Sequence, residues 1–129
     1  MLSVAKFTFN PFQENTYVVH DGSQAMVIDP GCSTTAEERE LEHFLADNAL
    51  TPVRLVLTHA HIDHVMGCAW VHQRYGLVPE LHPADDMIYA GAAQVARMYG
   101  LSFTEGPARG RALVPGETIK LGSDHLQVL

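Results

Sequence analysis

The first 28 positions alternate between apolar and polar residues, which is the pattern of β-strands with one buried face. Two or three strands are predicted there, and the turn Asp21-Gly22-Ser23 separates the apolar runs 17–19 and 25–28. Strands joined by so short a turn run in opposite directions. The N-terminal quarter of the chain is therefore predicted to be an antiparallel sheet.

An amphipathic helix is predicted next, over residues 33–48. A Thr-x-x-Glu start signal opens this segment, and Leu41, Phe44 and Leu45 recur at the spacing of one helix face. The continuous apolar run Leu55-Val56-Leu57 follows it. Because a run without alternation is typical of a strand covered on both faces, this segment is predicted to be a central strand of a sheet.

Strands and helices continue to alternate after this central strand. In chain order the patterns predict a helix over 65–76 that ends at Gly76, a short strand within 77–83, a helix over 83–100 with Pro83 in its first turn, a Gly- and Pro-rich loop over 102–116, and a hairpin over 117–129 with its turn at 122–124. The expected fold class is mixed α/β (α+β), in a single domain over residues 1–129.

Composition narrows the classes of function. The 129 residues carry 8 basic and 15 acidic side chains, a formal net charge of −7, and no basic run, which argues against a nucleic-acid partner. No segment reads as a membrane span or a signal sequence, so a cytoplasmic location is expected. Cys32 and Cys68 lie outside any CxxC pattern, so we expect two small, semi-buried residues rather than a disulfide framework or a cysteine zinc site.

A cluster of histidines follows the central strand. The segment THAHIDH places His59, His61, Asp63 and His64 within six positions, and three of the eight histidines of the chain fall there. Residues two apart in an extended chain lie on the same side, so His59 and His61 can converge on one metal ion through neutral ring nitrogens. Where the chain turns toward the next helix, Asp63 and His64 can hold a second ion, ~3.5–4 Å from the first.

Two interpretations are open for Asp29, which ends the apolar run of VIDPG. A carboxylate at that strand end could fix a metal-binding histidine or the loop backbone, whereas Asp before Pro-Gly is also a common turn residue. Trp70 and Tyr75 are expected to pack in the protein rather than bind a ligand. The histidines outside the cluster are expected at the surface: His20, His43, His72, His82 and His125.

These segments resemble a known family. THAHIDH matches the HxHxDH signature of the metallo-β-lactamase superfamily, and VIDPG matches the end of the first conserved strand of that superfamily. FNPFQENTYVV resembles the N-terminal strand of its glyoxalase II (hydroxyacylglutathione hydrolase)-like branch, and VPGETIKLGSDHLQVL resembles the hairpin before the next metal-binding histidine of that branch. The resemblance covers essentially the whole chain in order.

The resemblance implies an αββα sandwich with a two-metal centre between its sheets. His59 and His61 would bind the first metal and Asp63 and His64 the second, with Asp63 as the catalytic residue of the set and Asp29 in a supporting position. Zinc is the expected metal, two ions per complete site, with iron and manganese as alternatives.

Relatives place a third histidine, a bridging aspartate and a last histidine after the hairpin that this chain has at 117–129. The chain therefore resembles the N-terminal portion of a larger metallo-β-lactamase domain. We expect a missing C-terminal half, or a second copy in a homo-oligomer, to cover the open edge of its sheet.

The implied activity is that of a metal-dependent hydrolase that cleaves a small-molecule thioester with a metal-bound hydroxide. Lactone hydrolysis and a sulfur dioxygenase reaction at a single iron are alternatives on the same fold, and a non-catalytic metal-binding fragment is the alternative outside enzymes. Neither cysteine has the basic, histidine-paired surroundings of a nucleophile. Arg109 and Arg111 could face an anionic substrate, or could be solvated charges without a role.

Overall fold

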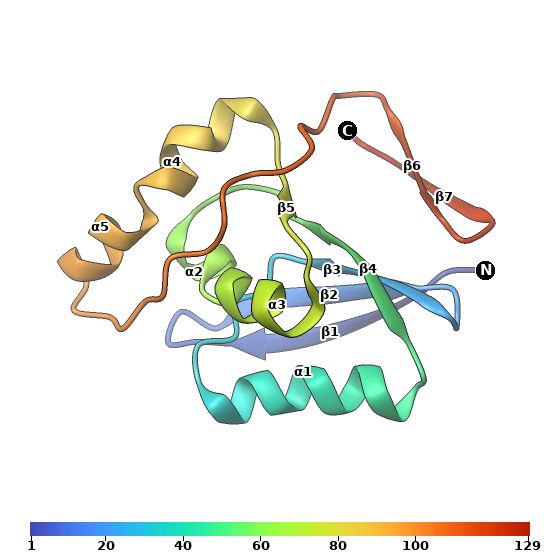
Figure 1. The fold of residues 1–129 in the computed structure, drawn as a ribbon, viewed down its shortest axis with the longest axis horizontal. Coiled ribbons are helices and arrows are strands. Elements are labelled where there is room, and N and C mark those ends of the chain that lie inside the picture. The colour runs from blue at the N-terminus through green and yellow to red at the C-terminus, as the bar shows by residue number, and fades with distance from the viewer.

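A five-stranded sheet forms the body of the molecule, and Figure 1 shows its arrangement in the computed structural model of residues 1–129. The strands of this sheet are β1 (Ser3–Phe9), β2 (Glu14–His20), β3 (Gln24–Ile28), β4 (Thr51–Val56) and β5 (Pro79–Glu80), and β6 (Thr118–Leu121) and β7 (Asp124–Gln127) form a separate hairpin. The helices are α1 (Thr35–Asp47), α2 (Ile62–Val65), α3 (Cys68–Tyr75), the 3₁₀ turn η1 (Pro83–Asp85), α4 (Asp86–Ala90) and α5 (Ala92–Met98). The predicted mixed α/β class is confirmed.

The strand order of the main sheet is β1-β2-β3-β4-β5. β1, β2 and β3 pair in antiparallel fashion, whereas β4 is parallel to both of its neighbours, β3 and β5. The antiparallel N-terminal sheet and the interior position of the strand that contains Leu55 agree with the prediction, and that side chain is fully buried. Because β3 and β4 are parallel, their carboxyl ends meet at one edge of the sheet, where ligand sites of α/β proteins lie.

Helix α1 begins where the sequence predicts it. The Thr34 hydroxyl oxygen accepts a hydrogen bond from the Glu37 amide at 3.2 Å, and Glu37 Oε1 accepts one from the Ser33 amide at 2.8 Å. Leu41 and Leu45 are buried in the core under the sheet, along which α1 lies (Figure 1). Each such leucine contributes about 1.5–3 kcal/mol of hydrophobic stabilisation, which fixes the helix on this face.

The helix predicted over 65–76 is wrong only at its start, because α3 begins at Cys68. Helix α2 already begins at Ile62, and a break at Met66 and Gly67 separates it from α3. The Gly67 amide donates a hydrogen bond to the Pro30 carbonyl at 2.7 Å, and a Cβ atom at this position would overlap Cys32 Sγ. Close packing against the loop after β3 therefore interrupts the helix, whereas the predicted end at Gly76, in the left-handed conformation, is confirmed.

The single helix predicted over 83–100 is also wrong, because the segment forms η1, α4 and α5 with a break at Gly91. α4 has no buried residue, whereas α5 buries Ala92 and Ala96 in the core. Glycine weakens a helix interior by ~1 kcal/mol relative to alanine. The change of direction at Gly91 lets α5 pack while α4 stays at the surface.

Apolar residues cover both faces of the sheet. The larger cluster of 20 buried residues lies among the sheet, α1, α2, α3 and α5. A smaller cluster of six lies where the β6–β7 hairpin packs on the other face of the sheet, on the side away from α1 (Figure 1): Val19, Met26, Val56, Leu113, Ile119 and Leu121. The irregular loop over 102–116 and the C-terminal hairpin are as predicted.

Cys32 and Cys68 are free, buried thiols, and burial raises the pKa of both. Trp70 and Tyr75 pack edge to face with ring centroids 5.7 Å apart, as expected for packing residues. None of the helices combines the length and the apolar composition that a membrane crossing requires.

Candidate metal centre

The cluster of candidate ligands lies at the carboxyl edge shared by β3 and β4. Asp29 directly follows β3, and its amide donates a hydrogen bond to the Val56 carbonyl of β4 at 3.0 Å. Its φ is +53°, a left-handed conformation that costs a residue other than glycine on the order of 1–3 kcal/mol. The hydrogen bonds of its buried carboxylate offset this strain and turn the side chain toward the loop after β4.

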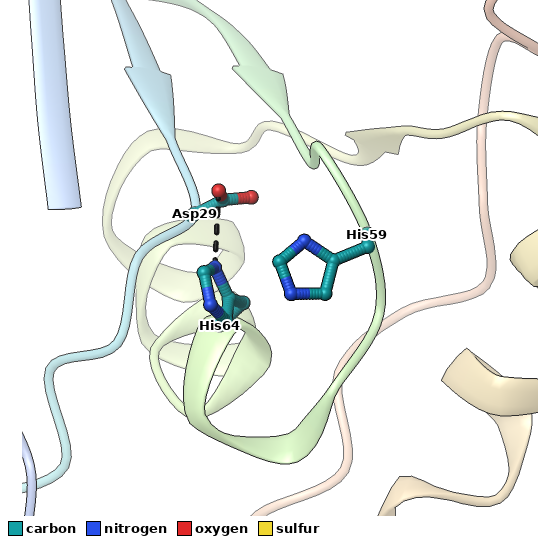
Figure 2. A group of neighbouring side chains, drawn as sticks. All are labelled: Asp29, His59 and His64. Atoms are coloured by element: carbon teal, nitrogen blue, oxygen red, sulfur yellow. Dashed lines mark ion pairs between the residues drawn. The ribbon is translucent and has the colours of Figure 1, made fainter. Parts of the chain in front are cut away.

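Three side chains bring potential ligand atoms together in this edge loop. One ligand atom from each of Asp29, His59 and His64 lies within 4.8 Å of the other two. Figure 2 shows how they meet: Asp29 comes from the end of β3, His59 from the loop after β4, and His64 from α2. The rings of His59 and His64 have centroids 3.9 Å apart.

The other two predicted ligands border this group. The ring of His61 has its centroid 4.7 Å from that of His59, and Asp63 Oδ2 lies 3.4 Å from His64 Nε2. The four predicted ligands of THAHIDH are therefore near neighbours. The three residues whose ligand atoms lie within 4.8 Å of one another nevertheless include Asp29, and not His61 or Asp63. The assignment of His59 and His61 to one metal and of Asp63 and His64 to another stays a prediction.

Asp29 holds the loop that carries the histidines. Its Oδ1 accepts the Thr58 amide at 2.8 Å, and its Oδ2 accepts the Thr58 hydroxyl at 2.5 Å. Oδ2 also lies 3.1 Å from His64 Nδ1. These are the contacts of a carboxylate that fixes both a loop backbone and a candidate ligand histidine, one of the two interpretations that the sequence leaves open.

Thr58 orients His59, a role that the sequence analysis missed. The Thr58 hydroxyl lies 3.0 Å from His59 Nδ1, and its own proton is directed to Asp29. Its oxygen therefore accepts from His59 when Nδ1 carries the proton, which leaves the lone pair of Nε2 for a metal. Burial lowers the pKa of His59, and the nearby His64 adds to this effect, so the neutral imidazole that binds metals is favoured.

Glu14, at the start of β2, is the second missed residue. Its Oε2 accepts the Thr16 hydroxyl at 2.9 Å, and its Oε1 lies 3.4 Å from His64 Nδ1. The pKa of Glu14 is raised to about 8, mainly by burial and to a smaller extent by the negative charges of Asp29 and Asp63, against the lowering effect of the Thr16 hydrogen bond. A polar residue at the start of a strand gives no sequence signal for such a contact.

The donor set fits a bound metal ion. Glu14 Oε1 and His64 Nδ1 are buried, and neither makes a hydrogen bond of good geometry. His64 Nδ1 lies 3.4 Å from Glu14 Oε1 and 3.1 Å from Asp29 Oδ2. Because Nδ1 faces these two carboxylates, Nε2 on the other side of the ring, 3.4 Å from Asp63 Oδ2, is the nitrogen left for an ion. Imidazole nitrogens beside carboxylate oxygens are ligands that zinc, iron and manganese all accept.

Two further side chains hold the backbone of the loop by hydrogen bonds. Asn10 Nδ2, from the turn between β1 and β2, donates to the Asp63 carbonyl at 2.8 Å and to the Gly31 carbonyl at 3.0 Å. Asp85 Oδ2, from η1, accepts the Ala60 amide at 3.1 Å. The loop is thus tied to segments far from it in the sequence, and neither tie could be predicted from the local pattern.

The remaining candidates lie outside the centre. Arg109 pairs with Asp86, with Nε 2.7 Å from Oδ1, and Arg111 pairs with Glu117, and these hydrogen bonds raise the pKa of each guanidinium. Both arginines are therefore engaged by carboxylates of the chain. The other five histidines take no part in the group of candidate ligands, and all but the half-buried His20 are exposed: His20, His43, His72, His82 and His125.

The fold and this centre define an α/β protein with a cluster of histidine and aspartate side chains at a sheet edge that could hold a metal ion. The family model described as the metallo-beta-lactamase superfamily matches residues 9–128, and the chain belongs to this superfamily. The match covers the sequence from the end of β1 to the last strand. The recognition made from THAHIDH and its neighbouring segments is confirmed.

Individual relatives agree with this membership. The chain is 39% identical over 116 residues to a hydroxyacylglutathione hydrolase of Cupriavidus taiwanensis, covering 83% of this chain and 41% of that protein. It is 35% identical, with a TM-score of 0.78, to TTHA1623 solved in a di-iron-bound form, covering 89% of this chain and 56% of the other. The BLEG-1 B3 metallo-beta-lactamase shares the fold, with a TM-score of 0.80 at 24% identity over 97% of this chain and 59% of the other.

The chain spans about half the length of these relatives, between 41% and 59% in the three cases. The superfamily, its hydrolase relatives and the candidate ligands together support the general class of metal-binding hydrolases. The identity of the metal, the substrate and the partners of the whole protein are matters of proposal.

Proposed function

We propose that this chain forms part of a metal-dependent hydrolase that cleaves thioesters, with His59, His61, Asp63 and His64 as metal ligands. The observation that carries the proposal is the convergence of Asp29, His59 and His64, with the Nδ1 atoms of both rings directed to protein oxygens. A likeness to the hydroxyacylglutathione hydrolase of Cupriavidus taiwanensis supports a thioester substrate.

A metal ion bound at this centre supplies Lewis acidity, which lowers the pKa of water toward neutrality and polarises a carbonyl oxygen. Zinc is the proposed metal, in a pair, and the di-iron form of TTHA1623 makes iron the alternative to test beside it. The chemistry needs no serine or cysteine nucleophile, in keeping with two thiols that are buried and hard to ionise.

The residues of the chain have separate tasks in this proposal. Thr58, held by Asp29, contacts Nδ1 of His59 and so leaves Nε2 of that ring free for an ion, and Asp29 also lies against Nδ1 of His64. Asp63, beside His64 Nε2, is the proposed catalytic carboxylate and would share the second ion with that histidine. In the net reaction, water adds to the carbonyl, the C–S bond breaks, and the products are a carboxylate and a thiol.

The test joins metal content with turnover on the full-length protein. We expect near-stoichiometric zinc or iron by inductively coupled plasma mass spectrometry, and release of a thiol from a 2-hydroxyacyl glutathione thioester. The double variant His59→Ala/His61→Ala should lose both, whereas His72→Ala, which removes an exposed histidine of α3, should keep both. Metal-loaded protein that opens a lactone but leaves every thioester intact would refute the thioester assignment in favour of the lactone hydrolase.

A further inference from the structure

An apolar hollow adjoins the candidate metal centre. Its volume is about 330 Å³, within the range of pockets that bind small molecules. His61 and Asp63 form its polar end, and most of the remaining wall is apolar, including Phe12, Ile88 and Tyr99. These walls come from the turn between β1 and β2, from α4, and from the residue that ends α5.

The apolar walls of the hollow leave large side chains in contact with water. Phe12 is 43% exposed, Ile88 45% and Tyr99 62%, although isolated apolar side chains of this size would gain free energy by burial. Phe12 and Tyr99 already contact each other edge to face, with ring centroids 5.5 Å apart. Exposed apolar groups gathered around a concave site mark a place where a ligand completes the burial.

The charge of the wall selects the kind of ligand. No lysine or arginine lines the hollow, and Asp63 is its one acidic residue. The carboxylates of a glutathione moiety would meet no cation here and would lie near a negative charge. An uncharged alkyl chain meets neither difficulty, because it needs only apolar contact.

We propose that the hollow binds an uncharged alkyl chain of the substrate, with the scissile carbonyl at the end formed by His61 and Asp63. This inference rests on the proposed function and names its substrate class: thioesters with a linear, apolar substituent next to the reacting carbon. The alkyl chain enters either as the acyl group or as the thiol part, and in either case Ile88 and Tyr99, which line the hollow, would contact it.

Kinetics of the full-length, metal-loaded protein test the inference. One series keeps the thiol constant and lengthens the acyl group from acetyl through butanoyl and hexanoyl to octanoyl, and a second series keeps acetyl and lengthens an alkyl thiol. We expect KM to fall by up to about fourfold for each buried methylene in one of the two series, while kcat changes less. The series that responds identifies which part of the substrate occupies the hollow.

Paired variants locate the effect. Ile88→Ser and Tyr99→Ala should abolish most of the dependence on chain length. Met87→Ser and Met98→Ala are matched controls, because these neighbours are 87% and 80% exposed and do not line the hollow. A dependence on chain length that survives in both hollow variants overturns the inference, and so does an equal loss in the controls.

Two outcomes separate this inference from the proposed function. If thioesters are cleaved but KM is independent of chain length in both series, the hydrolase stands and the alkyl site is refuted. If no thioester is cleaved, calorimetric binding of acetate, butanoate, hexanoate and octanoate to the metal-loaded protein decides. Affinity that rises with chain length and is lost in Ile88→Ser supports the site without the activity, and equal affinities refute the site as well.

Discussion

Replacing Thr58 by valine removes one hydroxyl group and keeps the shape of the side chain. That hydroxyl donates to Asp29 Oδ2 at 2.5 Å and lies 3.0 Å from His59 Nδ1. The Thr58 amide still donates to Asp29 Oδ1, so the backbone of the loop keeps its tie to β3. The substitution therefore tests the orientation of the histidine rather than the fold of the loop.

The magnitude follows from the two lost hydrogen bonds. Asp29 is 3% exposed, so its Oδ2 loses a partner that water cannot fully replace. A hydrogen bond to a charged group contributes ~1.5–3 kcal/mol, and part of it returns through the neighbouring His64. We expect the free energy of unfolding of the metal-free protein to fall by about 1–2 kcal/mol.

Metal affinity should fall further than stability. Without the hydroxyl, His59 Nδ1 has no fixed acceptor, so the ring can rotate and can carry its proton on either nitrogen. Groups that orient a ligand histidine typically contribute 10- to 100-fold to metal affinity, and we expect a loss of this order for Thr58→Val. Competition for zinc with a chromogenic chelator near neutral pH measures it.

Two further variants make the assay decisive. Thr58→Ser restores the hydroxyl and should recover most of the affinity. Thr51→Val changes an exposed threonine at the start of β4, the strand that precedes the loop of Thr58, and should leave the affinity unchanged. Equal zinc affinities of wild type and Thr58→Val would refute the reasoning that the hydroxyl orients His59.

Four other consequences of the structure can be tested. Gly31→Ala would place a Cβ 2.6 Å from the Asp63 carbonyl oxygen and onto Glu14 Oε2, so urea unfolding should show a loss of about 1–3 kcal/mol. Asn10→Ala removes two hydrogen bonds to loop carbonyls, so zinc affinity should fall, as chelator competition can show. Because the pKa of Glu14 is raised to about 8, the folded state holds a proton between pH 4.5 and about 8 that the unfolded state has released. The free energy of unfolding of the metal-free protein should therefore decline over this range. Urea unfolding at several pH values should show a flatter decline for Glu14→Gln. Removing the metal with a chelator should lower the thermal midpoint, by the equivalent of about 2.7 kcal/mol where free metal had been 100-fold above its Kd.

The elements of the fold were predictable where one pattern decided them. The alternation in β1 to β3, the Thr34 start signal of α1 and the continuous run in β4 each correspond to a single local cause, and each prediction is confirmed. The position of the candidate site after β4 followed from the same reasoning, because the carboxyl end of a parallel strand is set by strand direction.

The breaks in the predicted helices had causes outside the local pattern. Gly67 interrupts the first because Pro30 and Cys32, more than thirty positions earlier, occupy the space of a Cβ atom. At Gly91 the second helix changes direction so that α5 can reach the core through Ala92. A glycine within a helical pattern signals a weak point, but only the packing decides whether the helix breaks there.

The supporting residues of the centre could not be found by the reasoning that found the ligands. Histidines clustered within six positions are visible in the sequence, because their chemistry is unusual for a loop. Thr58, Glu14 and Asn10 are ordinary polar residues, and each gains its role only from the strand pairing that brings it to the cluster. Just beyond the paired residues of β2 and β3, the Thr16 hydroxyl lies within hydrogen-bond distance of both Glu14 Oε2 and the Asp29 carbonyl, a relation across the sheet that no local spacing encodes.

These supports explain how a short segment, only the end of which is helical (α2), can present several candidate ligands. Thr58 is held by Asp29 of the β3 end, Ala60 by Asp85 of η1, and Asp63 by Asn10 of the first turn. Hydrogen bonds to three separate elements therefore restrain the loop at its start, middle and end. Because the fold itself restrains the backbone, less conformational entropy is left for a metal to remove, so a metal should bind more tightly and stabilise the folded state by correspondingly more.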